Sequence, residues 1–250
     1  MKLPIATGLA FAIVAFASSA AFADCGALPD HATIQKALQG AVKPSGGPSN
    51  GGFDLNMWAT VVDRDGIVCN VAFSGKDRGD QWPGSRVISA QKANTANAFS
   101  LDGLALSTAN LFTAVQAGHS LFGLQESNPV DTAVAYGGNS AANGSSDDPM
   151  RGKKIGGVNV FGGGLALYKD GKVVGAIGVS GDSSCADHNV AWRVRKALGL
   201  GTVTGGVSAH KDDGIVYDID ANGVSKSGWG HPGCAGSEVD VAISIGAGNK

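Results

Sequence analysis

The sequence predicts a mixed α/β (α+β) domain whose central, mainly antiparallel sheet is flanked by helices. Two β-rich runs, residues 57–73 and 164–180, each contain an Asp-Gly pair near the middle, a pattern typical of a β-hairpin. Segments with apolar residues at helical spacing precede, separate and follow the two runs. Because tight turns join neighbouring strands, we expect antiparallel pairing with the helices packed against the sheet.

Residues 1–23 have the features of a cleavable secretion signal. Lys2 is followed by a mostly apolar run, residues 9–16, and by a small-residue tract that ends at Ala23. The apolar run is too short for a comfortable membrane span, and Asp24 stands where a lipoprotein needs a small residue. We therefore expect a periplasmic or secreted protein with no membrane insertion.

The composition is that of a weakly acidic, glycine-rich chain. It has 19 basic and 21 acidic side chains, so neither nucleic acid nor an anionic membrane surface is expected as a partner. The 39 glycines indicate tight turns and close backbone packing. Without the leader, the length suits one domain, residues 24–200, followed by a C-terminal extension, residues 201–250.

The first half of the domain is predicted to contain a helix and the first hairpin. Asp30 opens the helix, Ile34 and Leu38 occupy apolar positions, and the Pro/Gly/Ser cluster at 44–52 ends it. The first strand of the hairpin, residues 57–63, is largely apolar on both faces. This pattern indicates a central strand that is covered on both sides.

Two helices and a long loop are predicted between the hairpins. The first helix, residues 86–99, is rich in alanine and could lie close to a neighbouring surface. Ser107 or Thr108 could cap the second, which extends through Val115. The stretch 137–157 is rich in Gly, Ser, Asn and Asp, and it is predicted to be a mobile loop rather than an interdomain linker.

The second hairpin is followed by a predicted helix over residues 185–198, with Val190 and Val194 on its apolar side. The extension contains two short segments, residues 214–218 and 239–245, that are predicted to be β. We expect a disulfide at Cys234 to attach this extension to the domain.

The cysteine count predicts two disulfides. All four cysteines lie beyond the leader, and an even number in an exported chain favours oxidation. Three pairings are open; we favour Cys25 with Cys69 and Cys185 with Cys234, because each pair joins one half of the chain. Each bond would close a loop of about 45 to 50 residues, for which the chain-entropy model gives roughly 4 kcal/mol of stabilisation.

Three segments of the chain resemble a known family. They are residues 61–66, residues 89–96, and residues 170–181 followed by Asp187. Together they are similar to the GlcG/HbpS-like family, also called the haem-degrading or DUF336 domain, in the family's order and over residues 28–200. The resemblance implies a profilin-like α/β fold, homo-oligomer formation and, for exported members, haem binding. The loop around residues 137–150 and the extension after residue 200 depart from the family pattern.

Haem requires an apolar slot, usually an axial iron ligand, and often cationic partners for its propionates. His188 is the candidate iron ligand, because neighbouring Asp187 could orient its ring; the alternative is an exposed residue in the first turn of a helix. His119 lies among apolar residues that suit a pocket wall, or it simply ends a helix.

Arg86, Lys92 and Arg151 are the candidate partners for the propionates. The alternative is that these cations keep a glycine-rich surface soluble. Lys92 stands out because it lies among alanines within a segment that resembles the family, and a buried lysine needs an acceptor.

Other chemistries lack their signatures, and no catalytic residue is assigned. Residues 218–223 match the opening of a calcium loop, but Trp229 occupies the position of the expected bidentate Glu. Neither G-x-S-x-G nor H-E-x-x-H occurs, so serine and zinc hydrolase chemistry have no support. Glycines 175, 178 and 181 recur every third residue along and just after a strand, so a nucleotide-phosphate loop is not expected.

The leading hypothesis is an exported protein that binds haem or a related tetrapyrrole for storage, scavenging or sensing. A second hypothesis is an enzyme that degrades haem or converts another small metabolite. A third is a module that binds a protein partner in the cell envelope.

Overall fold

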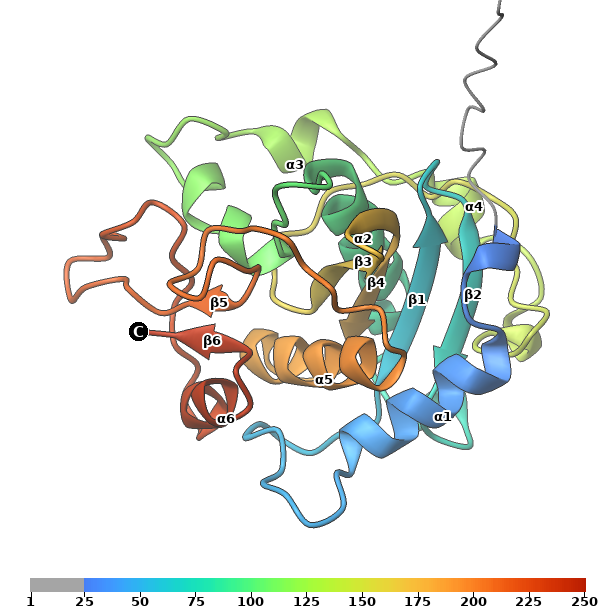
Figure 1. The fold of residues 1–250 in the computed structure, drawn as a ribbon. Helices are drawn as coiled ribbons and strands as arrows, with labels where there is room; N and C mark the ends of the chain where they lie inside the picture. The colour runs from blue at the N-terminus through green and yellow to red at the C-terminus, as the bar shows by residue number, and fades with distance from the viewer. Residues whose placement is uncertain (1–24) are drawn as a thin grey trace, which may run out of the picture.

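The computed structural model describes residues 25–250, so the predicted leader, residues 1–23, lies outside the described residues (Figure 1). The centre of the fold is a four-stranded sheet made from two hairpins. The first consists of β1 (Trp58–Asp63) and β2 (Val68–Phe73), and the second of β3 (Gly164–Lys169) and β4 (Lys172–Ser180). The strand order is β2-β1-β4-β3 and every pairing in this sheet is antiparallel. The predicted fold class and both hairpins are confirmed.

The two hairpins meet along β1 and β4, with Trp58 opposite Ser180 at one end and Asp63 opposite Gly175 at the other. All residues of β1 and β2 are buried. Ala59 and Val61 of β1 contribute to one hydrophobic core, whereas Trp58 and Val62 contribute to a second. Since successive side chains of a strand point to opposite faces, the sheet is covered on both sides, as the apolar pattern predicted.

Three long helices provide this cover (Figure 1). The helices α1 (His31–Val42) and α5 (Ser184–Ala197) share the first core, and α2 (Gly84–Phe99) contributes to the second. Asp30 caps α1 by accepting a hydrogen bond from Thr33 N at 2.8 Å. The sheet therefore lies between a two-helix layer and a one-helix layer.

The α2 layer lies close to the backbone of the sheet. A Cβ atom on Gly178 of β4 would lie 2.0 Å from Ser89 O and 2.5 Å from Ala93 N. Only a hydrogen atom fits at this position. The glycine at position 178 of β4 thus has a packing cause.

Short helices connect the main elements. The predicted helix after Ser107 consists of two 3₁₀ turns, η3 (Thr108–Leu111) and η4 (Thr113–Val115), and Ser107 caps the first through a capping box with Asn110. The remaining short helices are η1 (Cys25–Ala27), η2 (Arg78–Asp80), α3 (Leu124–Ser127), α4 (Thr132–Tyr136) and η5 (Ser140–Ala142).

The C-terminal region contains β5 (Ile215–Val216), α6 (Glu238–Ser244) and β6 (Gly248–Asn249), and its two strands pair in parallel. The predicted β structure at residues 239–245 is wrong, because this segment is mostly α6. Its apolar residues alternate along the sequence, which mimics a strand. The residues it buries, Glu238, Val241 and Ala242, instead follow helical spacing.

Both predicted disulfides are present. Cys25 pairs with Cys69 at a Cα–Cα distance of 5.4 Å, and Cys185 pairs with Cys234 at 6.1 Å. The second bond ties the C-terminal region to the start of α5, as expected. Within residues 25–250, no helix combines the length and apolar character needed to cross a bilayer.

Candidate functional site

Lys92 and Asp187 form a buried ion pair between the two helical layers. Lys92 of α2 donates to Asp187 Oδ2 of α5 at 2.7 Å and to the Val179 carbonyl of β4 at 3.0 Å. Both side chains are almost fully buried. Burial raises the pKa of Asp187 to about 6 and lowers the pKa of Lys92, although each charge favours the other. The predicted need of Lys92 for an acceptor is thus met inside the fold.

Arg86 forms a second buried pair, with Asp148 of the 137–157 loop. Its Nε donates to Asp148 Oδ2 at 2.8 Å, and its Nη2 donates to Asp148 Oδ1. Asp148 also accepts from the backbone amides of Gly144 and Met150. A bidentate pair of this kind fixes both partners in direction as well as distance. The loop that the sequence predicted to be mobile is therefore anchored on α2 at this point.

His188 lies beneath the C-terminal region. Its side chain is fully buried, and Nε2 donates to the Ala247 carbonyl at 3.2 Å, while Nδ1 has no partner. Burial lowers the pKa of His188 to about 3. The ring is neutral at physiological pH and is not the exposed first-turn residue considered as the alternative. Because the side chain is fully buried, an external ligand could reach it only after the residues around it had moved.

His119 and Arg151 lie at the surface. His119 is in the connection between η4 and α3, and Arg151 donates to the Ser146 carbonyl at 2.8 Å. Asp187 accepts from Lys92 and not from His188, so the expected orienting contact to the His188 ring is not formed. The five residues proposed for haem do not line a common cavity among those found in the described chain.

A largely apolar groove lies between α1 and α5 and has a volume of about 580 Å³. It carries two cations, Lys36 from α1 and Arg193 from α5. Arg193 Nη2 donates to the Pro48 carbonyl at 3.0 Å, but its buried Nε has no partner. Burial lowers the pKa of Arg193. The other lining residues are Thr33, Ala37, Gly40, Ala41, Ala197 and Leu198.

Sequence reasoning did not identify this groove. A usable signal exists, because each cation lies four residues before a small residue on its own helix: Lys36 before Gly40, and Arg193 before Ala197. That these two helices face each other, however, depends on the tertiary structure, which the sequence of neither helix reveals alone. The arrangement can bind an anionic group at one point and apolar surface beside it.

The fold and these features define a mixed α/β domain with an antiparallel sheet between helical layers. The chain belongs to the HbpS-like family of haem-degrading proteins, whose family model matches residues 32–196. The match ends within α5, so the C-terminal region that covers His188 lies beyond it. No curated protein matches the chain.

Solved structures with a similar fold include PduOC in complex with haem, at 22% identity and a TM-score of 0.47, covering 69% of this chain and 94% of that one. Klebsiella pneumoniae protein ORFY, of family DUF336, has 22% identity and a TM-score of 0.45, covering 68% and 90%. A double mutant of HbpS from Streptomyces reticuli has 19% identity and a TM-score of 0.43, covering 78% and 99%.

Proposed function

We propose that this chain is an exported protein that binds haem, or a related tetrapyrrole, for storage, scavenging or sensing. Membership of the HbpS-like family over residues 32–196 is the observation that carries the proposal. Two disulfides are compatible with an oxidising compartment outside the cytoplasm.

The groove between α1 and α5 fits the carboxylate-bearing edge of a porphyrin. Arg193 has a buried donor without an acceptor, and Lys36 adds a second positive charge. The alanines and Leu198 provide an apolar wall for the ring. No histidine, cysteine, methionine or tyrosine is among the residues that line the groove, so it supplies no iron ligand of its own.

The residues proposed from the sequence would need different rearrangements before they could bind haem. Arg86 and Lys92 would each have to leave a buried carboxylate, which costs several kcal/mol. His188 is fully buried, so it could ligate iron only after the residues around its ring had moved. His119 and Arg151 are accessible without rearrangement. We propose Arg193 and Lys36 as the first partners of the propionates, because both line an apolar groove and neither forms an ion pair among the described residues.

The test is a hemin titration of the mature chain, residues 24–250, followed by the Soret band. We expect a saturable spectral shift, and Arg193→Ala should weaken binding about tenfold, equivalent to ~1.4 kcal/mol. Lys196→Ala is the matched control, because it removes an exposed cation of the same helix outside the groove. Parallel titrations of His188→Ala and His119→Ala test the iron ligand. The absence of any saturable shift would rule out the proposal.

The family's description as haem-degrading favours one alternative, an enzyme that breaks haem down. The chain loaded with haem distinguishes binding from degradation. Loss of haem absorbance with release of iron, on addition of a reductant and oxygen, would indicate degradation. A stable complex under those conditions would indicate binding alone.

We also propose that the chain forms a homo-oligomer, as its resemblance to the family implies, and that it could engage an envelope protein. Several large apolar side chains are exposed and available for contact, among them Phe53, Phe122 and Tyr136. Light scattering on the purified chain tests the first idea. Capture from the cell envelope tests the second.

A further inference from the structure

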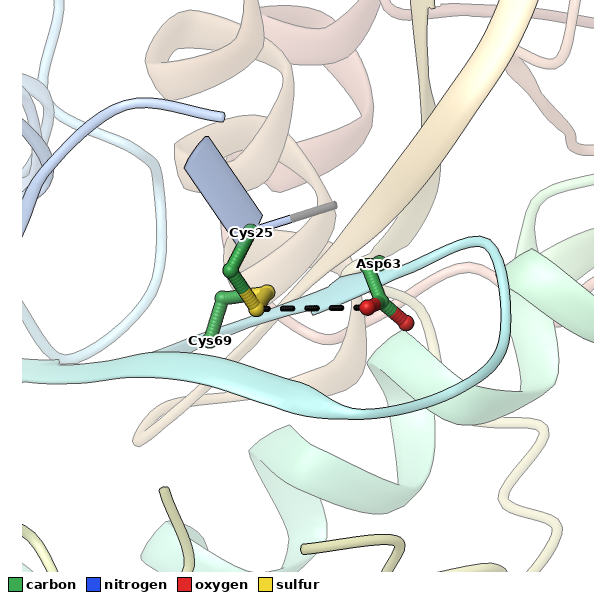
Figure 2. A group of neighbouring side chains, drawn as sticks. All are labelled: Cys25, Asp63 and Cys69. Atoms are coloured by element: carbon green, nitrogen blue, oxygen red, sulfur yellow. Dashed lines mark hydrogen bonds between the residues drawn. A yellow bond between two sulfur atoms is a disulfide. The ribbon is translucent and has the colours of Figure 1, made fainter. Parts of the chain in front are cut away.

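Two sulfur atoms and one carboxylate gather at the turn end of the first hairpin. Cys25 comes from η1, Asp63 ends β1, and Cys69 lies in β2 (Figure 2). One potential ligand atom from each residue lies within 4.8 Å of the other two. The sulfurs are joined as a disulfide in this structure.

The carboxylate of Asp63 is only half satisfied. The residue is 1% exposed, and Oδ1 accepts hydrogen bonds from Asp65 N at 3.0 Å and Ile67 N at 2.9 Å. Oδ2 has one contact, Cys25 Sγ at 3.9 Å, which Figure 2 shows as a dashed line. A disulfide sulfur carries no hydrogen, so a buried carboxylate oxygen points at a group that cannot donate to it. Asp63 makes no ion pair with any residue in the described range.

The two cysteines of the cluster border a solvent-connected cavity. This cavity has a volume of about 690 Å³ and is also lined by Asp30, His31 and Arg151. Cys25 is half-buried, and the helical turn that carries it buries none of its residues. A small ion or a reductant therefore has a path to the sulfurs.

We propose that Cys25, Cys69 and Asp63 form a redox-gated site for a thiophilic divalent cation such as Zn²⁺. A dithiol reductant gives two electrons and two protons to the disulfide and itself becomes a disulfide. The two thiols release their protons as they bind the cation, Asp63 Oδ2 is the third ligand, and water is the fourth. Closure of the disulfide removes both sulfur ligands, so the oxidised chain does not bind. This inference is independent of haem binding.

The geometry requires only a local adjustment. Tetrahedral zinc with sulfur at about 2.3 Å places two sulfurs about 3.8 Å apart. Opening the disulfide must therefore move the sulfurs away from each other while Oδ2 stays near. The turn at residues 25–27 can supply this movement, because it anchors no buried side chain, whereas Asp63 and Cys69 are fixed in the sheet.

Cobalt titration of the mature chain tests the proposal, because thiolate-bound Co²⁺ has a near-ultraviolet charge-transfer band. After reduction with a phosphine, we expect one Co²⁺ per chain, displaced by Zn²⁺, and none in the oxidised chain. The double substitution Cys25→Ser with Cys69→Ser should abolish the band. Asp63→Asn should weaken binding by roughly tenfold or more.

The matched control is the double substitution Cys185→Ser with Cys234→Ser, which retains the site and leaves one disulfide to open. If reduction of both disulfides unfolds the wild-type chain, the titration of this variant tests the proposal instead. Circular dichroism checks that the chain is folded in each titration. Alkylation is measured in parallel, and Zn²⁺ should block it at Cys25 and Cys69. A folded, reduced control chain without the band, or an undiminished band in the Cys25/Cys69 variant, would overturn the proposal.

Discussion

The buried Lys92–Asp187 pair is the residue-scale feature with the largest energetic consequence. Removal of one partner leaves the other charge buried and uncompensated. We expect Lys92→Met to lower the free energy of unfolding by about 3 kcal/mol, measured by urea denaturation at pH 7. Adding Asp187→Asn should recover part of this loss, since no unpaired charge remains.

The exposed pair Lys172–Asp102 is the control for this prediction, because its side chains are 73% and 50% exposed. Lys172→Met should change the free energy of unfolding by less than about 0.5 kcal/mol. Equal effects at the two lysines would show that burial does not govern the energy of the inner pair.

Two buried histidines predict a loss of stability in acid. Burial lowers the pKa of His188 to about 3 and that of His231 to about 4. In the unfolded chain both have ordinary values near 6.5, so below that pH the unfolded state binds more protons. Stability should therefore fall as the pH drops from 7, by about 2 kcal/mol per histidine at pH 5. Urea denaturation at the two pH values measures this loss.

His188→Gln should remove its share of the pH dependence between pH 7 and 5. Asp187 acts in the opposite sense, because its pKa is raised to about 6 and its protonation on folding favours the folded state in acid. An Asp187→Asn chain should thus be more sensitive to acid than the wild type. A wild-type chain whose stability is flat from pH 7 to 5 would contradict the histidine contribution.

At the scale of elements, the C-terminal region depends on the Cys185–Cys234 bond. This region is short in regular structure, with strands of two residues and one helix of seven. We expect Cys185→Ser with Cys234→Ser to lower the free energy of unfolding by roughly 2 to 5 kcal/mol. Hydrogen exchange should rise most in residues 215–249, while β1 and β4 keep their protection.

The same variant tests access to His188. If the region over its ring opens, hemin binding that depends on His188 should strengthen, whereas binding at Arg193 should not change. A uniform increase in hydrogen exchange that includes the sheet would instead show that the Cys185–Cys234 bond stabilises the whole domain and not this region alone.

The elements that the sequence predicted well are those with a local cause. Each hairpin turns at an Asp-Gly pair, and α1 begins at the capping residue Asp30. The errors also have causes. The apolar residues of α6 alternate as in a strand, and the helix predicted after Ser107 is broken into two 3₁₀ turns. The conformation of both segments depends on their packing against the rest of the fold, and no local sequence pattern encodes that packing.

The candidate site was less predictable than the fold, because its partners are distant in sequence. Arg86 and Asp148 are 62 residues apart, and Lys92 and Asp187 are 95 apart. The sequence identified Arg86 and Lys92 as candidates but could not show that both already pair with a carboxylate. Likewise, nothing in the sequence around Arg193 indicates that this residue lines a groove formed with α1.

The whole molecule is a sheet clamped between two helical layers, and its spacing depends on Gly178. Because a Cβ there would meet the backbone of α2 at Ser89 and Ala93, Gly178→Ala must push that layer away from the sheet. We expect the free energy of unfolding to fall by about 3 kcal/mol in urea denaturation. Gly84→Ala, at the first residue of the same helix with open space around it, should instead be neutral or stabilising by up to about 1 kcal/mol. If both substitutions were equally tolerated, the close contact between α2 and β4 would not limit the packing of the domain.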